Sequence, residues 1–162
     1  MPRFSGELLL LVIGRTQDAL IDRLEAADDE TASSAPSAPT GDWFIQRILD
    51  IYQGRIGYYV TDAENIAKFV STGLEMGSTL GPRSTNAGDR VVARIRDIIE
   101  AGQSAGALRA DLSAEIIARN VNGIYIHEVL RSPARKFDIS LTWDRLAERF
   151  DVMLRPLTTS DS

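Results

Sequence analysis

The sequence predicts an all-α protein, folded as one antiparallel bundle of about six helices over residues 1–162. Apolar residues recur at three- and four-residue spacing through most of the chain, as on the buried face of a helix. No segment alternates apolar and polar residues between turn signals, as a half-buried strand would. Glycine, proline and capping residues divide the helical pattern at short intervals, which favours antiparallel neighbours.

The first helix is predicted over residues 7–27, where apolar residues such as Leu9 and Leu20 share one side. Residues 28–41 begin with three acidic residues and continue rich in Ser, Ala and Pro, which predicts a flexible loop. The apolar run 8–13 is far shorter than the roughly 20 residues of a membrane span and lacks signal-peptide flanks. We therefore expect a cytoplasmic protein.

Two helices are predicted next. Asp42 is a candidate N-cap for a helix over 43–60, and residues 61–64 form a capping box that opens a third helix to about residue 76. Gly54 and Gly57 lie inside the second helical pattern and each costs about 1 kcal/mol relative to alanine. A kink beside a cavity or a tight helix contact would justify that cost.

The last three helices are bounded by recognisable signals. Asn86 or Asp89 opens the fourth, and Gly106 is suited to end it. Ser113 is a good N-cap for the fifth, which ends before Pro133, and the last begins near Leu141.

The fifth and last helices look too apolar for one chain to bury. Residues 121–130 are apolar almost all round, and the last helix carries an apolar stripe with a charged back. Two such helices from each of two chains would form a four-helix interface about a two-fold axis. The alternative is that both helices simply complete the core of the monomer. The interface candidates are Ile124, Val129, Leu146, Phe150 and Met153.

Residues 99–115 read Ile-Glu-Ala-Gly-Gln-Ser-Ala-Gly-Ala-Leu-Arg-Ala-Asp-Leu-Ser-Ala-Glu. This segment resembles the C-terminal domain of tetracycline-repressor (TetR) family regulators, in which a helix often ends in Gly-x-x-x-Gly-x-Leu-Arg-x-Asp. The physics of the junction agrees: Gly106 closes one helix, Leu108 plugs the core, and Ser113 caps the next. Residues 144–157 also resemble the closing helix of the family, with Pro156 in place of the usual glycine. The resemblance extends over roughly residues 85–157.

The resemblance implies an effector-binding and dimerisation domain with an aromatic and apolar cavity for a small apolar molecule. The family's helix-turn-helix would precede the first helix, and residues 4–8 resemble the junction that follows it. Because only six residues precede Glu7, we expect that this chain lacks the headpiece and that DNA is bound only by the intact regulator. A wrongly chosen start codon, a truncation or a naturally headless protein would each account for this.

Candidate ligand-binding residues are the aromatic and polar side chains expected near such a cavity: Trp43, Phe44, Tyr52, Tyr59, Phe69, Asn120, Tyr125 and His127. Aromatic residues at helical spacing are more often core than ligand contacts. Asn120 is expected on an apolar face, where its amide needs a partner. It would anchor a ligand or pair across the dimer, and both readings stay open.

Composition excludes several other classes of function. The net charge is -5, so a broad nucleic-acid footprint on this chain is not expected. There is no cysteine and one histidine, which rules out disulfides and thiolate chemistry and makes a metal site improbable. His127 and Glu128 form the only catalytic-looking pair, but adjacent helical residues point about 100° apart. We therefore expect no enzyme activity, no cofactor and no metal.

Two rival functions remain. A headless copy could form mixed dimers with a complete regulator and block its DNA binding, using the same apolar helices. A small helical enzyme or carrier would use a cavity around Tyr125 and His127, although no residue pattern asks for catalysis.

Overall fold

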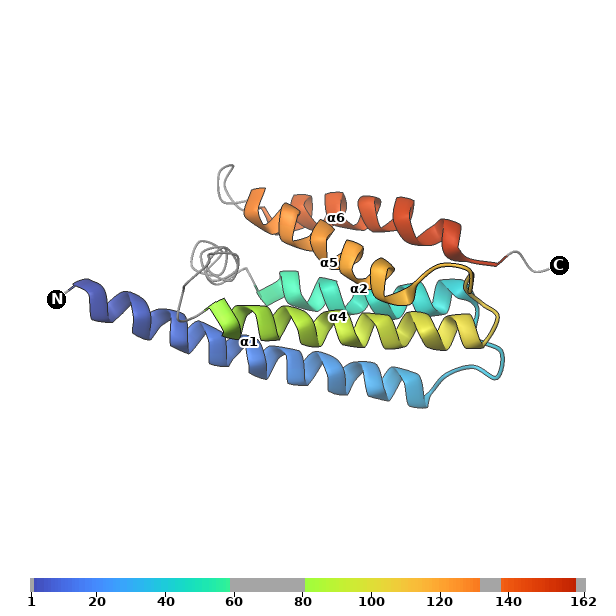
Figure 1. Cartoon of the computed structure of the whole chain (residues 1–162), viewed down its shortest axis with the longest axis horizontal. Helices are drawn as coiled ribbons and strands as arrows, with labels where there is room; N and C mark the ends of the chain where they lie inside the picture. Colours follow the sequence, from blue (N-terminus) through green and yellow to red (C-terminus); the bar gives the residue numbers. More distant parts are fainter. Residues whose placement is uncertain (1, 59–80, 132–137, 160–162) are drawn as a thin grey trace.

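The computed structural model describes residues 2–58, 81–131 and 138–159. These residues form α1 (Pro2–Ser33), α2 (Gly41–Gly57), α4 (Gly81–Ser104), α5 (Ala114–Arg131) and α6 (Ile139–Leu154), followed by the short 3-10 helix η3 (Arg155–Leu157) (Figure 1). Within these ranges no strand occurs, only an isolated antiparallel bridge between Leu108 and Thr158. The all-α prediction is confirmed, and the helix expected over 61–76 lies outside the described residues.

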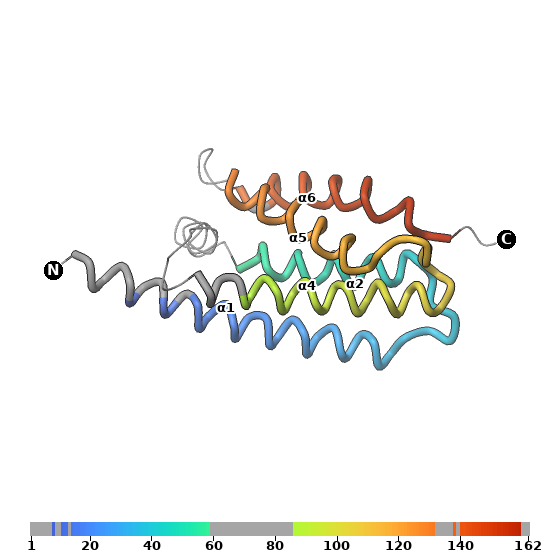
Figure 2. The backbone as a smooth tube through the Cα atoms, viewed as in Figure 1, coloured from blue at the N-terminus to red at the C-terminus, as the bar shows by residue number. Residues whose placement is uncertain are grey.

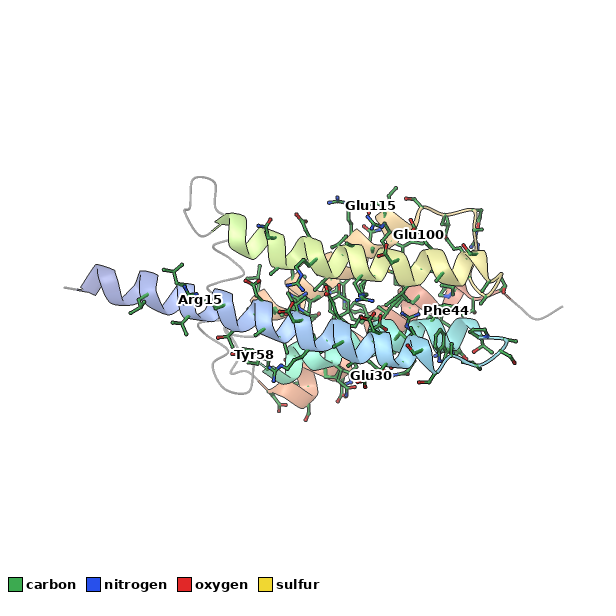
Figure 3. The ribbon with its side chains drawn as sticks, turned by 90° about the horizontal axis from the view of Figure 1, so that it is seen from below. Arg15, Glu30, Phe44, Tyr58, Glu100 and Glu115 are labelled. Atoms are coloured by element: carbon green, nitrogen blue, oxygen red, sulfur yellow. The ribbon has the colours of Figure 1, made fainter. Side chains whose placement is uncertain are left out.

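The helices lie along one long axis. Consecutive described pairs run antiparallel, whereas α1 and α4 run side by side in the same direction (Figures 1 and 2). Seen from below, Arg15 lies toward the projecting end of α1 and Glu30 toward the opposite end (Figure 3). The α5–α6 pair covers the opposite side of the bundle from α1, and α2 and α4 lie between. The N-terminal end of α1 projects beyond the other helices.

One core runs through the bundle. It is built from the apolar faces that the sequence periodicity marks on α2, α4, α5 and α6, and Ile21 of α1 joins it. Its most deeply buried side chains include Ile48, Ile95, Val121, Leu146 and Phe150. None of the described helices is long and apolar enough to cross a membrane.

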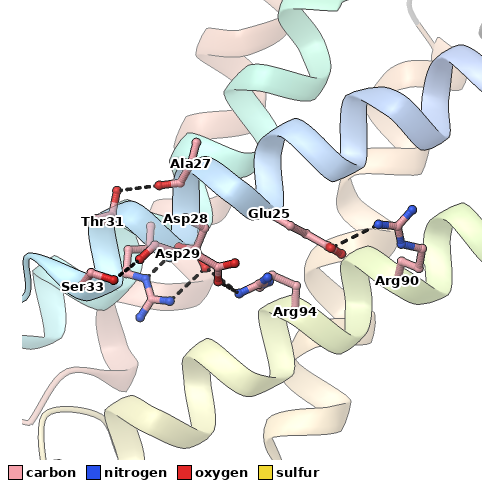
Figure 4. A network of polar contacts seen from close by, with 9 residues as sticks. Glu25, Ala27, Asp28, Asp29, Thr31, Ser33, Arg90 and Arg94 are labelled. Carbon is pink, nitrogen blue, oxygen red and sulfur yellow. Dashed lines mark hydrogen bonds and ion pairs between the residues drawn. The ribbon is translucent and has the colours of Figure 1, made fainter.

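The expected loop over 28–41 is wrong for residues 28–33, because α1 continues to Ser33. Asp28 is buried and accepts two hydrogen bonds from Arg47, at 2.8 and 2.9 Å. Arg94 of α4 reaches both Asp28 and Asp29, at 3.3 and 2.7 Å (Figure 4). The acidic run is therefore a helical turn tied to two other helices, and only residues 34–40 connect α1 to α2.

Four helix starts lie earlier than expected, including that of α1, which begins at Pro2 rather than at residue 7. Thr40, not Asp42, caps α2, because its hydroxyl accepts from the Trp43 amide at 3.3 Å. Asp138 caps α6 in the same way, with its carboxylate accepting from the Leu141 amide at 3.0 Å. The fourth expected helix begins at Gly81 rather than at residue 86 or 89.

The junction between α4 and α5 has the predicted form. Gly106 adopts φ +73, and the amides of Ala107 and Leu108 bond back to the Gly102 carbonyl at 2.9 and 3.0 Å. Leu108 is buried against Gly102, where an added Cβ would lie 2.6 Å from Leu108 Cδ1. The Ser113 hydroxyl accepts from the Ile116 amide at 3.3 Å. The roles predicted for Gly106, Leu108 and Ser113 are confirmed.

Candidate ligand-binding site

The candidate site begins with a charged residue on an apolar helix face. Buried residues recur along α2 at Ile48, Ile51, Tyr52 and Ile56. Arg55 follows Ile48 by seven residues, so it lies on the same face and its guanidinium enters the core. Only 6% of Arg55 is exposed.

Two residues of α5 meet this arginine. Asn122 Oδ1 accepts from the Tyr52 hydroxyl at 3.2 Å and from Arg55 Nη1 at 3.5 Å. The Arg55 guanidinium lies 4.2 Å from the Tyr125 ring centroid and 5.9 Å from that of Tyr52. We refer to Tyr52, Arg55, Asn122 and Tyr125 as the Arg55 cluster. Phe150 of α6 extends it, with its ring centroid 5.0 Å from that of Tyr52.

The cluster carries a positive charge and no described negative one. A guanidinium stays protonated throughout the physiological range. Arg55 forms no ion pair with a carboxylate of the described residues, and its buried Nε has no hydrogen-bond acceptor there. Burial raises the pKa of the Tyr52 hydroxyl, with the charge of Arg55 opposing the shift. Tyr52 is therefore a neutral hydrogen-bond donor.

A second buried donor without an acceptor in the described part comes from α1. It is the Gln17 side-chain Nε2, on a residue that is 4% exposed. Leu24 of α1 packs on Gly54, and Asp28 pairs with Arg47, which sets the antiparallel register of α1 and α2. Gln17 lies two turns before Leu24, and this register brings it toward the Arg55 end of α2.

The structure brings together two of the eight predicted ligand residues, Tyr52 and Tyr125, with ring centroids 5.2 Å apart. Trp43 and Phe44 instead form an edge-to-face pair, 4.9 Å between centroids, at the other end of α2. At 1.5 Å per residue this is about 12 Å along the helix from Tyr52. These two aromatics do not join the Arg55 cluster.

The remaining predicted ligand residues lie elsewhere. Asn120 is exposed and does not join the Arg55 cluster, and Ile116 and Ile124 lie one turn before and after it on α5. His127 is also exposed, and its Nδ1 lies 2.8 Å from Arg149 Nη1. Tyr59 and Phe69 lie outside the described residues.

Sequence reasoning missed Arg55 and Asn122. The position of each residue around its helix was the signal that could have identified them. Arg55 interrupts an apolar stripe at its own helical position, and Asn122, not Asn120, shares a face with Ala118 and Tyr125, both fully buried. A two-residue step on a helix turns by about 200°, so Asn120 and Asn122 lie on nearly opposite faces of α5.

The predicted dimer residues divide into two groups. Val129, Leu146 and Phe150 are at most 1% exposed within a single chain, so their assignment to a free interface is corrected to the monomer core. Ile124 and Met153 are half-buried and line a groove of about 550 Å³ between α5 and α6. Glu128 is buried at the base of this groove and accepts a hydrogen bond from Arg149 at 2.9 Å.

Among the described residues no group of histidine and acidic side chains has the arrangement of a metal site. Comparison with known proteins gives no match to a family model, a curated protein or a solved structure.

Proposed function

We propose that this chain is the effector-sensing and dimerisation domain of a TetR-like transcriptional regulator. The observation that carries the proposal is the double role of α5. One side of this helix supplies Asn122 and Tyr125 to the Arg55 cluster, and another supplies Ile124 and Glu128 to the groove with α6. A ligand that displaces α5 would also change the interface, which is how differential binding shifts a two-state regulator.

The outer face of α5 and α6 has the chemistry of a two-fold interface. Four large apolar side chains are exposed on these helices: Ile116, Leu130, Leu141 and Val152. The groove also carries charges of both signs, Glu148 beside Arg145 and Arg149. A surface with both signs can be complementary to its own copy, as an isologous contact requires.

The projecting end of α1 supports a place for a DNA-reading unit. Leu8, Leu11 and Val12 in the N-terminal part of α1 are exposed. Apolar side chains grouped on a protruding helix favour a covering partner. In the proposed regulator a helix-turn-helix unit preceding α1 covers them, and the acidic domain itself makes no DNA contact.

Light scattering in solution tests the dimer on which the proposal depends. The expected mass is twice the 17.8 kDa of one chain. Val152→Arg, at a position 73% exposed in the groove, should produce monomers. Ala26→Arg adds the same charge on an exposed position of α1 and should leave the dimer intact. A monomer at all concentrations in the unsubstituted protein would refute the proposal.

The same interface also supports a second candidate, an interaction protein that forms mixed dimers with a complete regulator. Co-expression with such a regulator distinguishes the two. Mixed dimers that lose operator binding favour the interaction protein, and homodimers alone favour the sensing domain.

A further inference from the structure

We infer that the Arg55 cluster binds the carboxylate of a small organic acid with an apolar or aromatic body. This inference rests on the proposed effector-binding function and assigns the effector a chemical class. It replaces the uncharged apolar molecule expected from the sequence with an anion.

Two buried arginines on α2 differ in how their charges are paired. Arg47 and Arg55 both belong to α2 and are 8% and 6% exposed. Arg47 forms a two-bond ion pair with Asp28, at 2.8 and 2.9 Å. Arg55 has one hydrogen bond, to a neutral amide oxygen at 3.5 Å, and a buried Nε without an acceptor in the described residues. A buried charge is costly unless it is paired, so the bundle carries at Arg55 a cost that it removes at Arg47.

The surroundings of the Arg55 guanidinium indicate the direction from which a ligand would approach it. The Arg55 guanidinium carbon lies over the Tyr125 ring, 4.2 Å from the ring centroid, so this ring occupies one side of the charged group. The edge of a guanidinium holds its N–H donors in a plane that matches the two oxygens of a carboxylate. A carboxylate placed against the Nε edge would supply the missing acceptor and neutralise the charge together.

The aromatic side chains at the Arg55 cluster indicate what the rest of the ligand would be. Tyr52 and Tyr125 within the cluster and Phe150 beside it supply three aromatic rings. The Tyr52 hydroxyl is engaged with Asn122. Aromatic side chains favour an apolar ligand body, and the guanidinium would orient that body through one polar contact.

The first test needs no ligand. Thermal unfolding of the ligand-free protein is measured for Arg55→Met and for the matched control Arg47→Met. Because Arg47→Met leaves the buried Asp28 carboxylate without its main partner, Tm should fall by roughly 10 °C. Arg55→Met removes an uncompensated charge, so Tm should stay unchanged or rise. A fall as large as that of the control would mean that Arg55 is a structural residue and would overturn the inference.

The second test uses phenylacetate and decanoate, each compared with its neutral amide, by calorimetric titration. At least one acid should bind about tenfold or more tightly than its amide, and Arg55→Met should abolish this preference. Arg55→Lys keeps the charge but loses the planar fork, so it should recover only part of the affinity. Acid and amide binding equally, or neither acid distinguishing wild type from Arg55→Met, would overturn the inference.

These outcomes are separate from those of the proposed function. Neither test uses DNA, and measuring all variants at one protein concentration keeps the dimer contribution to Tm comparable between them. A protein that dimerises through the α5–α6 groove but ignores carboxylates would keep the regulator proposal and lose the anion site. A monomer that binds phenylacetate through Arg55 would do the reverse.

Discussion

Asp28 and Arg47 form a two-bond buried ion pair that joins the end of α1 to the first turns of α2. Their side chains are 2% and 9% exposed, and Arg94 of α4 approaches the same carboxylate at 3.3 Å. One acidic residue therefore ties three helices together at the end of the bundle where α1 stops (Figure 4).

We predict that Asp28→Asn destabilises the protein by about 3 kcal/mol or more, because it leaves the buried Arg47 without its counter-charge. The double variant Asp28→Leu/Arg47→Met should cost less than Asp28→Asn alone, since both charges are then removed. Urea unfolding followed by circular dichroism measures both. Asp29→Asn is the control, because the Asp29 side chain is 65% exposed and its pair with Arg94 should be worth at most about 1 kcal/mol. Equal losses for Asp28→Asn and Asp29→Asn would contradict the prediction.

The same ion pair shows why the sequence predicted the helices better than their ends. Residues 28–33 contain helix-compatible residues, but acidic and small residues together resemble a loop. Their partners, Arg47 and Arg94, lie 19 and 66 positions away from Asp28, and local composition carries no record of such contacts. The Gly106 and Ser113 signals succeeded because a positive φ and a capping hydroxyl are local requirements.

The candidate site was predictable only in part for a related reason. Tyr52 and Tyr125 follow from aromatic residues on apolar faces. Arg55 lies on the apolar face of α2, but an arginine is usually solvated, so its residue type alone predicts an exposed position. Val129, Leu146 and Phe150 were assigned to a dimer because an apolar stripe does not say whether the neighbouring helix belongs to the same chain.

The α4–α5 junction gives a prediction about two glycines. Gly106→Ala should cost about 1–2 kcal/mol, because an alanine is strained at φ +73 although nothing lies within 4 Å of its Cβ. Gly102→Ala should also destabilise, by a different mechanism, since its Cβ would lie 2.6 Å from Leu108 Cδ1 and must displace a buried leucine.

Gly123→Ala is the matched control, because this helical glycine faces open space within one chain. It should stabilise a single chain by up to about 1 kcal/mol through helix propensity. The free energies of unfolding of the three variants provide the measurement. Gly106→Ala matching Gly123→Ala would show that the left-handed turn is not required in solution.

The raised pKa of Tyr52 predicts a loss of stability in alkali. The unfolded group ionises near its ordinary value of 10.0, whereas burial holds the folded hydroxyl protonated to higher pH. Between these values the unfolded state binds fewer protons than the folded state, so stability is fully present below about pH 10 and falls as pH rises further. Urea midpoints from pH 8 to pH 11 measure this slope.

Tyr52→Phe should make the alkaline slope shallower. It should also cost about 1 kcal/mol at neutral pH, because the Asn122 carbonyl loses a donor. The alkaline loss would then originate elsewhere if Tyr52→Phe and the unsubstituted protein had the same slope.

The pair Glu128–Arg149 gives a prediction about the contact between α5 and α6. Glu128 is 2% exposed and accepts from Arg149 at 2.9 Å, with Arg131 at 4.0 Å, at the base of the groove proposed as the dimer face. Glu128→Gln removes the charge with little change of shape, so it should destabilise the single chain by about 1–3 kcal/mol and weaken the dimer as α6 loosens.

Glu148→Gln alters an exposed carboxylate of the same groove and should leave chain stability within about 0.5 kcal/mol. Unfolding at several protein concentrations separates the two effects, because only the dimer contribution depends on concentration. A Glu128→Gln protein as stable as Glu148→Gln would show that the buried carboxylate does not hold α5 against α6.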